Sequence, residues 1–204
     1  VLYNCIDIAT IQANQLDRSE ARNKLNIPRD AFVFGNIHRL DKSKGHDYMI
    51  RAFAKSSEAM PAAIAVIIGG GDRKSLLEGI AEECGVADRV ILAGVVHNAS
   101  WYTNAFDVYV APSLHEGFGL GLLEGMAASL PILTSTGGAT PEVAGDAGFS
   151  FPPGDSDTLA EHMKTVYLMN NSERTQMGQS SLQRLQENFS RETYHNNVVQ
   201  LFAS

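Results

Sequence analysis

The chain has 204 residues, 44% hydrophobic and 19% charged, and its 16 basic and 23 acidic residues give a formal net charge of -7. This length suits one sizeable domain that buries roughly 70% of its unfolded surface. The negative charge argues against general nucleic-acid binding, which needs a basic face. The apolar runs are too short to cross a bilayer, and residues 1–15 lack the pattern of a signal peptide. We therefore expect a soluble, cytoplasmic chain.

Short apolar segments alternate with helical patterns along most of the chain. Helices are predicted to begin near Asp47, Asp72 and Gly119, with a short helical piece at 98–105. Strands that are apolar on both faces and alternate with helices predict a parallel sheet. The expected fold is a doubly wound, Rossmann-like α/β domain spanning residues 1–204, with strands at 31–37, 62–68, 89–94, 106–113, 130–135 and 147–152.

Only helix is predicted after residue 152. Asp155 or Asp157 should cap the first helix of this tail, Ser172 should open the second, and Ser190 the third. Apolar residues at helical spacing predict inward-facing stripes on the first and third helices. These residues are Leu159, Met163, Val166 and Tyr167 in the first helix, and Tyr194, Val198, Leu201 and Phe202 in the third.

The two cysteines and six histidines do not form a metal-binding pattern. Cys5 and Cys84 lie far apart and have no partners at metal-ligand spacing, so buried free thiols are expected. The histidines are scattered along the chain. We expect no metal site.

The residues that follow each strand are the candidates for ligand binding, because ligands of open parallel sheets bind beyond the carboxyl ends of the strands. Arg39 and Lys44 follow the first strand, and Gly45 allows the chain to turn into the next helix. A local pair of cations in an acidic protein suits an anion such as a diphosphate, although solvated loop cations would have the same sequence. The glycines of residues 69–72 predict a tight turn with a conformational role.

Residues 114–131 hold two glutamates, Glu116 and Glu124, on either side of a glycine-rich helix start. Gly117, Gly119 and Gly121 disfavour helix but permit unusual backbone angles and close approach to the amides of a helix N-terminus, where anions and hydroxyls bind. The carboxylates could accept hydrogen bonds from sugar and ribose hydroxyls. Surface glutamates on a helix remain the alternative. Residues 134–145 are explained by a glycine turn and a helix start near Pro141.

Three segments together resemble the C-terminal, donor-binding domain of the family 4 retaining glycosyltransferases, which have the two-domain GT-B fold. They are residues 38–53, 69–94 and 111–155, in order and with the spacing of the family. Residues 1–7 are similar to the interdomain link of the family, and 191–202 to the segment that returns towards the other domain. The resemblance covers nearly the entire chain.

This resemblance implies roles for individual residues. Arg39 and Lys44 match the basic pair that neutralises the diphosphate leaving group, which makes them catalytic together with Glu116, beside the donor sugar. Glu124 matches the carboxylate that binds the ribose hydroxyls. The remaining implied donor-binding residues are Gly117, Phe118, Gly119 and Leu120, whose backbone amides would contact sugar and phosphates, and Gly94, Val95 and Val96, which would hold the base.

The sequence departs from the family pattern at two positions. His38 stands where a small residue usually precedes the arginine, and Cys5 replaces the glycine of the link. The first change puts the geometry of the phosphate loop in question, and the second only the hinge. The resemblance implies metal-independent sugar transfer with retained anomeric configuration, with a nucleoside-diphosphate sugar as co-substrate and no other cofactor.

The resemblance also implies that an N-terminal acceptor domain is missing from this chain. The chain alone is therefore expected to bind nucleotide sugar weakly and to have little transferase activity. The acceptor, a glycan or lipid-linked glycan of polysaccharide biosynthesis, would bind through the missing domain, and the full-length parent could lie at the membrane periphery.

Other functions are considered as alternatives. A non-hydrolysing sugar-nucleotide epimerase has a similar architecture, and a non-catalytic nucleotide-sugar-binding module would keep the fold without the activity. A nicotinamide-dependent dehydrogenase is disfavoured because no G-x-G-x-x-G motif follows an early strand.

Overall fold

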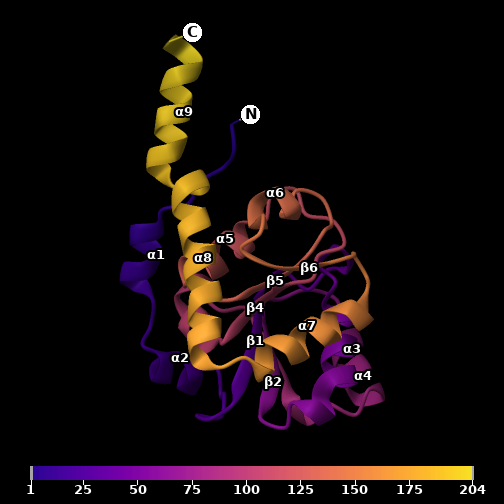
Figure 1. Cartoon of the computed structure of the whole chain (residues 1–204). Coiled ribbons are helices and arrows are strands. Elements are labelled where there is room, and N and C mark those ends of the chain that lie inside the picture. Colours follow the sequence, from indigo (N-terminus) through magenta and orange to yellow (C-terminus); the bar gives the residue numbers. More distant parts are fainter. Residues whose placement is uncertain (1, 204) are drawn as a thin grey trace.

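The computed structural model describes residues 2–203 and has a parallel sheet at its centre (Figure 1). Within this range the sheet is six-stranded, in the order β3-β2-β1-β4-β5-β6. All neighbouring strands pair in parallel. The strands are β1 Phe32–Ile37, β2 Ala63–Ile68, β3 Val90–Gly94, β4 Val108–Ala111, β5 Ile132–Ser135 and β6 Gly148–Phe151. This confirms the predicted doubly wound α/β fold.

Helices cover both faces of the sheet. On one face lie α3 (His46–Ser56), α4 (Lys74–Glu83) and α7 (Ser156–Leu168), and on the other α2 (Arg18–Lys24), α5 (Leu120–Ala127) and α8 (Asn171–Phe189). Alternate strand residues enter the two cores: Phe34 packs on the first face and Val33 on the second. Successive side chains of a strand point to opposite faces, and both faces of this sheet are covered by helices. The strands must therefore be apolar at every position.

Shorter elements connect these layers. They are α1 (Ile8–Asn14), α6 (Thr140–Ala144), and the 3₁₀ helices η1 (Lys42–Lys44), η2 (Ser57–Ala59), η3 (Ala87–Arg89) and η4 (Ala99–Ala105). The predicted short helices near residue 98 and Pro141 correspond to η4 and α6. Helices α1 and α2 were not predicted, although the side chains of Asp7 and Asp17 cap them by accepting hydrogen bonds from Thr10 N and Ser19 N.

The C-terminal tail is helical as expected, and of its first two helices only the start of the second differs from the prediction. Asp155 caps α7, with hydrogen bonds from the amides of Asp157 and Thr158. The N-cap of α8 is Asn170, two residues before the expected Ser172, because Asn170 and Glu173 form a reciprocal capping box.

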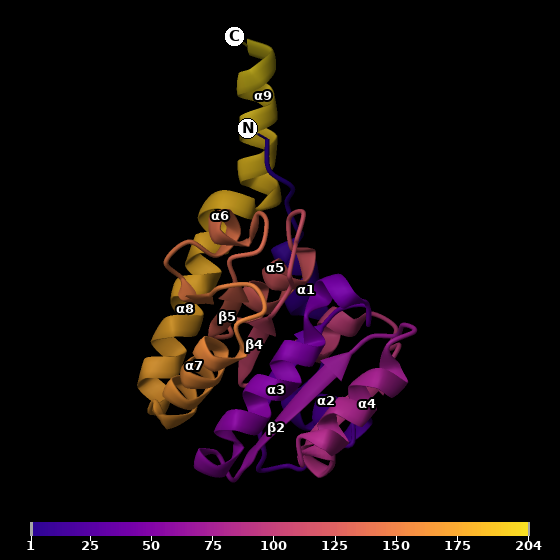
Figure 2. The same cartoon turned by 90° about the vertical axis from the view of Figure 1, so that its right-hand side faces the viewer.

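Helix α9 (Arg191–Ala203) follows α8 and projects from the body of the molecule (Figures 1 and 2). Its predicted inward stripe is wrong: the described part of α9 holds no buried residue, and the exposed fractions are 37% for Tyr194 and 89% for Phe202. An apolar stripe at helical spacing shows which residues share a face, but not what the face contacts.

Both cysteines are free thiols, as expected, but they are half-buried rather than buried.

Candidate functional site

The sheet divides at the carboxyl ends of β1 and β4. These strands pair only at Phe34↔Val108 and Gly35↔Tyr109, whereas β1 and β2 stay paired as far as Ile37↔Ile68. Because β2 and β3 lie on one side of this pair and β5 and β6 on the other, the strand order reverses here. Open α/β sheets bind ligands at such a switch point.

A buried polar pair occupies the point of division. The side-chain amide of Asn36 donates to the carbonyl of Val110 at 2.7 Å, so it continues the connection where backbone pairing has stopped. His46, at the first turn of α3, donates from Nε2 to Asn36 Oδ1 at 2.9 Å. Burial lowers the pKa of His46 to about 3, which keeps the ring neutral. Sequence reasoning missed this pair, because no local pattern links a strand residue to a residue in the next helix.

Lys44 and Glu116 meet directly beyond the division. Lys44 Nζ lies 2.8 Å from Glu116 Oε2, and both side chains are only about a tenth exposed (11% and 12%). The two loops also share a backbone hydrogen bond, from Leu114 N to Ser43 O at 2.7 Å. Gly45 turns the chain into α3 with a φ of 65°, and a Cβ there would lie 2.0 Å from the carbonyl oxygen of Pro112. Gly45 therefore serves both the expected turn and the close approach of the loops.

Glu116 is ionised in this position. Hydrogen bonding from His38, followed by that from Lys44, lowers the pKa of its carboxyl to about 2, against the opposing effect of burial. Ser113 Oγ donates to the same carboxylate oxygen at 3.1 Å. The site thus contains a fixed negative charge with three donors around one of its oxygens.

The loop after β5 holds the backbone of Glu116. Glu116 N donates to Gly137 O at 3.1 Å, and Ala139 N donates to Glu116 O at 3.0 Å. Gly138 has a φ of 80°, and a Cβ there would lie 2.2 Å from Glu116 O. In the sequence these glycines indicated only a turn; the structure shows that they also allow two loops to approach closely.

Helix α5 begins beside Glu116 with an uncapped N-terminus. Gly119 precedes the helix with a φ of 93° and no side-chain cap, so the first amides of α5 are unpaired within the helix. A Cβ on Gly119 would lie 3.4 Å from Glu116 Cγ, which places the helix start against the carboxylate. Gly121 has a different function from the one expected, because it lets α5 pack against the Tyr109 hydroxyl and Ile37 carbonyl.

Phe118 fixes this loop from the side. Its ring contacts those of Tyr3 and Phe189, with centroids 6.2 and 5.7 Å apart. The Tyr3 hydroxyl in turn donates to Glu142 at 3.2 Å. The ring of Phe118 thus takes part in packing, and the ligand contact predicted for its backbone amide stays a prediction. Leu120, the first residue of α5, is exposed.

Glu124 lies one turn into α5 and is partly buried, and its side-chain carboxyl has no hydrogen-bond partner among residues 2–203. Burial raises the pKa of its carboxyl to about 7. A carboxyl group that loses its hydration without gaining a protein donor is unfavourable for the fold alone. Such a group is suited to receive donors from a ligand.

The other predicted site residues lie apart from the Lys44–Glu116 contact. Arg39 has an exposed side chain (81%) and pairs with Asp41 at 3.1 Å, so it does not join Lys44 on Glu116. Gly94 turns after β3 with a φ of 74°, and Val95 is exposed. Val96 packs partly against the core on the α5 face. The glycine turn at 69–72 supports this edge, because a Cβ on Gly69 would lie 1.9 Å from His38 O.

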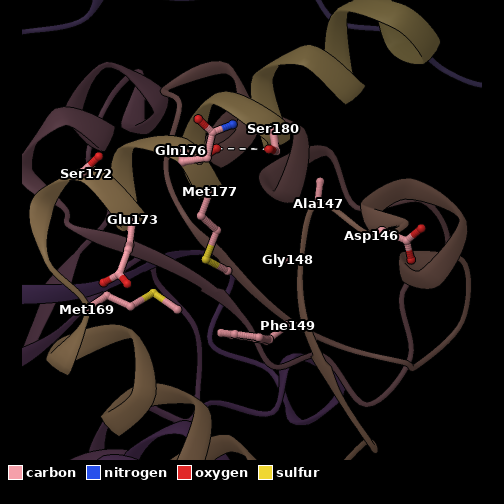
Figure 3. A pocket seen from close by; sticks show the side chains of 10 residues that line it. All are labelled: Asp146, Ala147, Gly148, Phe149, Met169, Ser172, Glu173, Gln176, Met177 and Ser180. Carbon is pink, nitrogen blue, oxygen red and sulfur yellow. Dashed lines mark hydrogen bonds between the residues drawn. The ribbon is translucent and has the colours of Figure 1, made fainter.

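A separate cavity lies between the start of β6 and helix α8 (Figure 3). Its volume is about 560 Å³, and side chains of Phe149, Met169 and Met177 point into it. None of the predicted site residues lines it.

Within residues 2–203, no group of three His, Cys, Asp or Glu side chains is arranged as a metal site. No helix in the same range is long and apolar enough to span a membrane.

A Rossmann-like sheet with a Lys–Glu contact at its switch point is the arrangement of the α/β domains that bind ligands beyond their strand ends. The family model described as glycosyl transferases group 1 matches residues 17–184. The chain belongs to this family, and its fold is that of the C-terminal domain of a GT-B glycosyltransferase.

Sequence relatives support the same family. The chain is 31% identical over 186 residues to the lipopolysaccharide core biosynthesis glycosyltransferase LpsE of Rhizobium meliloti, covering 90% of this chain and 53% of that protein. It is 34% identical over 142 residues to a D-inositol 3-phosphate glycosyltransferase of Stackebrandtia nassauensis, covering 63% of this chain and 32% of that protein. The chain thus spans about half the length of LpsE.

Solved structures share the fold. HepE of Anabaena, in complex with UDP and glucose, superposes with a TM-score of 0.86 at 23% identity, over 100% of this chain and 56% of HepE. The C-terminal domain of the group 1 glycosyl transferase LpcC of Francisella tularensis gives a TM-score of 0.77 at 24% identity, over 91% of this chain and 99% of that domain.

Proposed function

We propose that this chain is the donor-binding half of a retaining, metal-independent glycosyltransferase whose donor is a nucleoside-diphosphate sugar. The observation that carries the proposal is the Lys44–Glu116 contact beside the uncapped start of α5. A cation and unpaired amides suit a diphosphate, and a carboxylate suits sugar hydroxyls. The family membership and the UDP bound by HepE support this donor class.

Each group of proposed residues would contact a different part of the donor. Lys44 and the amides of residues 117–120 would hold the diphosphate, with Arg39 reaching in from the loop edge. Glu116 would face the sugar, and Glu124 the ribose. Gly94, Val95 and Val96 would contact the base. Retention and independence from metal are carried over from the family resemblance, and the acceptor would be a glycan or lipid-linked glycan bound by a second domain.

The proposed chemistry places positive charge where negative charge develops. When the bond from the anomeric carbon to the diphosphate breaks, charge accumulates on the leaving phosphate. Lys44 and the helix amides stabilise that charge more strongly in the transition state than in the ground state. Loss of one such donor typically reduces the rate by about 10² to 10³. With only about half of a relative's length, the chain alone should bind donor weakly and transfer little.

The test is binding calorimetry on the 204-residue chain with ADP, GDP, UDP, CDP and dTDP, and with the nucleoside of whichever binds. Lys44→Ala should weaken diphosphate binding about tenfold or more, because a charged hydrogen bond contributes about 1.5–3 kcal/mol. Nucleoside binding should stay nearly unchanged. Lys42→Ala is the matched control, since this exposed lysine lies two residues away. Equal losses for nucleoside and nucleotide, or equal losses in both variants, would contradict the assignment.

A further inference from the structure

The carboxylate of Glu116 is held through only one of its two oxygens. Oε2 accepts from Lys44 Nζ at 2.8 Å, His38 Nε2 at 3.1 Å and Ser113 Oγ at 3.1 Å. Oε1 accepts no hydrogen bond from the part of the chain that the structure describes. Since an ionised carboxylate has about four acceptor positions, the free oxygen can still accept from ligand hydroxyls.

Once a ligand binds, Lys44 can no longer donate only to Glu116. In the proposed function its ammonium group must also contact the diphosphate, and its long, flexible side chain can turn from one anion to the other. The carboxylate would then depend on its remaining donors for its orientation. These donors are the ring of His38 and the hydroxyl of Ser113.

His38 is built rigidly enough for this task. Its backbone amide donates to Ile68 O at 3.0 Å, which continues the β1–β2 pairing beyond the strands. Its carbonyl packs against Gly69, where any Cβ would clash at 1.9 Å. Its ring lies beside α5, since a Cβ on Gly121 would lie 3.8 Å from His38 Cδ2. Glu116 is ionised, so the facing Nε2 of His38 carries the hydrogen and donates.

We propose that His38 is a positioning residue that holds the Glu116 carboxylate towards the donor sugar while Lys44 engages the diphosphate. This inference rests on the proposed function. It gives a role to the residue at which the sequence departs from the family pattern. His38 touches Glu116 and acts on the sugar only through it, so its removal should affect recognition of the sugar and not that of the diphosphate.

The experiment measures the affinity of the 204-residue chain for a nucleoside diphosphate and for the corresponding nucleotide sugar. His38→Ala should weaken nucleotide-sugar binding about tenfold, the size expected for one hydrogen bond to a charged group, and leave nucleoside-diphosphate binding nearly unchanged. His38→Gln, whose Nε2 can donate in place of the ring, should restore most of the loss. His115→Ala, at an exposed histidine next to Glu116 in sequence, is the control and should change neither affinity.

A double-mutant cycle tests whether His38 acts through Glu116. With Glu116→Ala already present, which removes the acceptor of the His38 hydrogen bond, His38→Ala should cause no further loss of nucleotide-sugar affinity. An additive loss in the double variant would overturn the proposal, as would equal weakening of nucleoside diphosphate and nucleotide sugar by His38→Ala. If the folded wild-type chain binds no nucleoside diphosphate, the proposed function itself fails. If it does bind, the difference between the two ligands decides the role of His38.

Discussion

At the scale of single residues, two glutamates on either side of one helix start have opposite electrostatic environments. Glu116 has three donors and a pKa of about 2, whereas Glu124 has none and a pKa of about 7. The first carboxylate is therefore charged throughout the physiological range, and the second changes its charge within that range. In the proposed function, the contact of Glu124 to the ribose should therefore depend on pH near neutrality, whereas that of Glu116 to the sugar should not.

The pH dependence of Glu124 gives a prediction for stability. Its folded-state pKa lies above the ordinary value of 4.5, so between pH 4.5 and 7 the folded chain keeps a proton that the unfolded chain releases. The stabilising contribution of this group is complete below about pH 4.5 and is lost as the pH rises through 7. Glu124→Gln should therefore gain stability relative to wild type between pH 5 and pH 8, as measured by urea unfolding.

The matched control is Glu161→Gln, which removes an exposed glutamate from α7. Its stability difference from wild type should change little over the same pH range. A Glu124→Gln difference in stability that is equal at pH 5 and pH 8 would contradict the raised pKa.

The affinity for nucleoside should change with pH in the opposite direction to the stability. In wild type it should rise as the pH increases through 7, because only the ionised carboxylate accepts from both ribose hydroxyls.

At the scale of elements, the position of α5 depends on how closely it packs on β4. Gly125 lies over the ring of Tyr109, where a Cβ would be 2.5 Å from the ring carbon Cγ. Tyr109 is fully buried, and its hydroxyl donates to Ile37 O at 3.3 Å. The glycines of this helix therefore let its axis approach the sheet and bring its N-terminus to Glu116.

Gly125→Ala should destabilise the chain by about 1–3 kcal/mol, the usual cost of overpacking, although alanine favours helix. Gly79→Ala in α4 is the control: a Cβ there meets nothing within 4 Å, so the substitution should stabilise by about 0.5–1 kcal/mol. Chemical unfolding of both variants checks the prediction. Similar stabilisation by both substitutions would show that α5 does not pack this closely.

Sequence periodicity predicted the strands and main helices because their burial is repetitive. Residues 62–68, apolar throughout, predicted a fully buried strand, and β2 is buried along its whole length. Relations between elements could not be predicted in this way. The Asn36–His46 pair and the support of Glu116 by Gly137 and Gly138 depend on how loops from different strands meet. Charge alone also could not separate Lys44, which contacts Glu116, from the exposed Arg39.

At the scale of the whole molecule, α9 stands outside the packed body. It has no buried residue in its described length, and its contacts with the body include an ion pair from Arg191 to Asp7 at 2.8 Å. The preceding helix, α8, is packed against the body up to its end, because Phe189 is buried between the N-terminal segment and the loop before α5.

Truncation after Ser190 should therefore leave the melting temperature nearly unchanged, since little apolar surface is lost from the core. Phe189→Ala in the full chain should cost about 3–5 kcal/mol, as expected for a buried aromatic residue. Differential scanning calorimetry of both proteins measures the contrast. A truncated chain that melts as early as the Phe189 variant would show that α9 is part of the cooperative fold.

In the proposed function, Lys44 and the start of α5 hold the diphosphate of a nucleotide sugar at the switch point of the sheet. A crystal structure of the chain with its best-binding nucleoside diphosphate tests this most directly. We predict phosphate oxygens within hydrogen-bond distance of Lys44 Nζ and of a backbone amide among residues 117–120. A diphosphate bound elsewhere, for example in the cavity between β6 and α8, with the Lys44 site empty, would contradict the account.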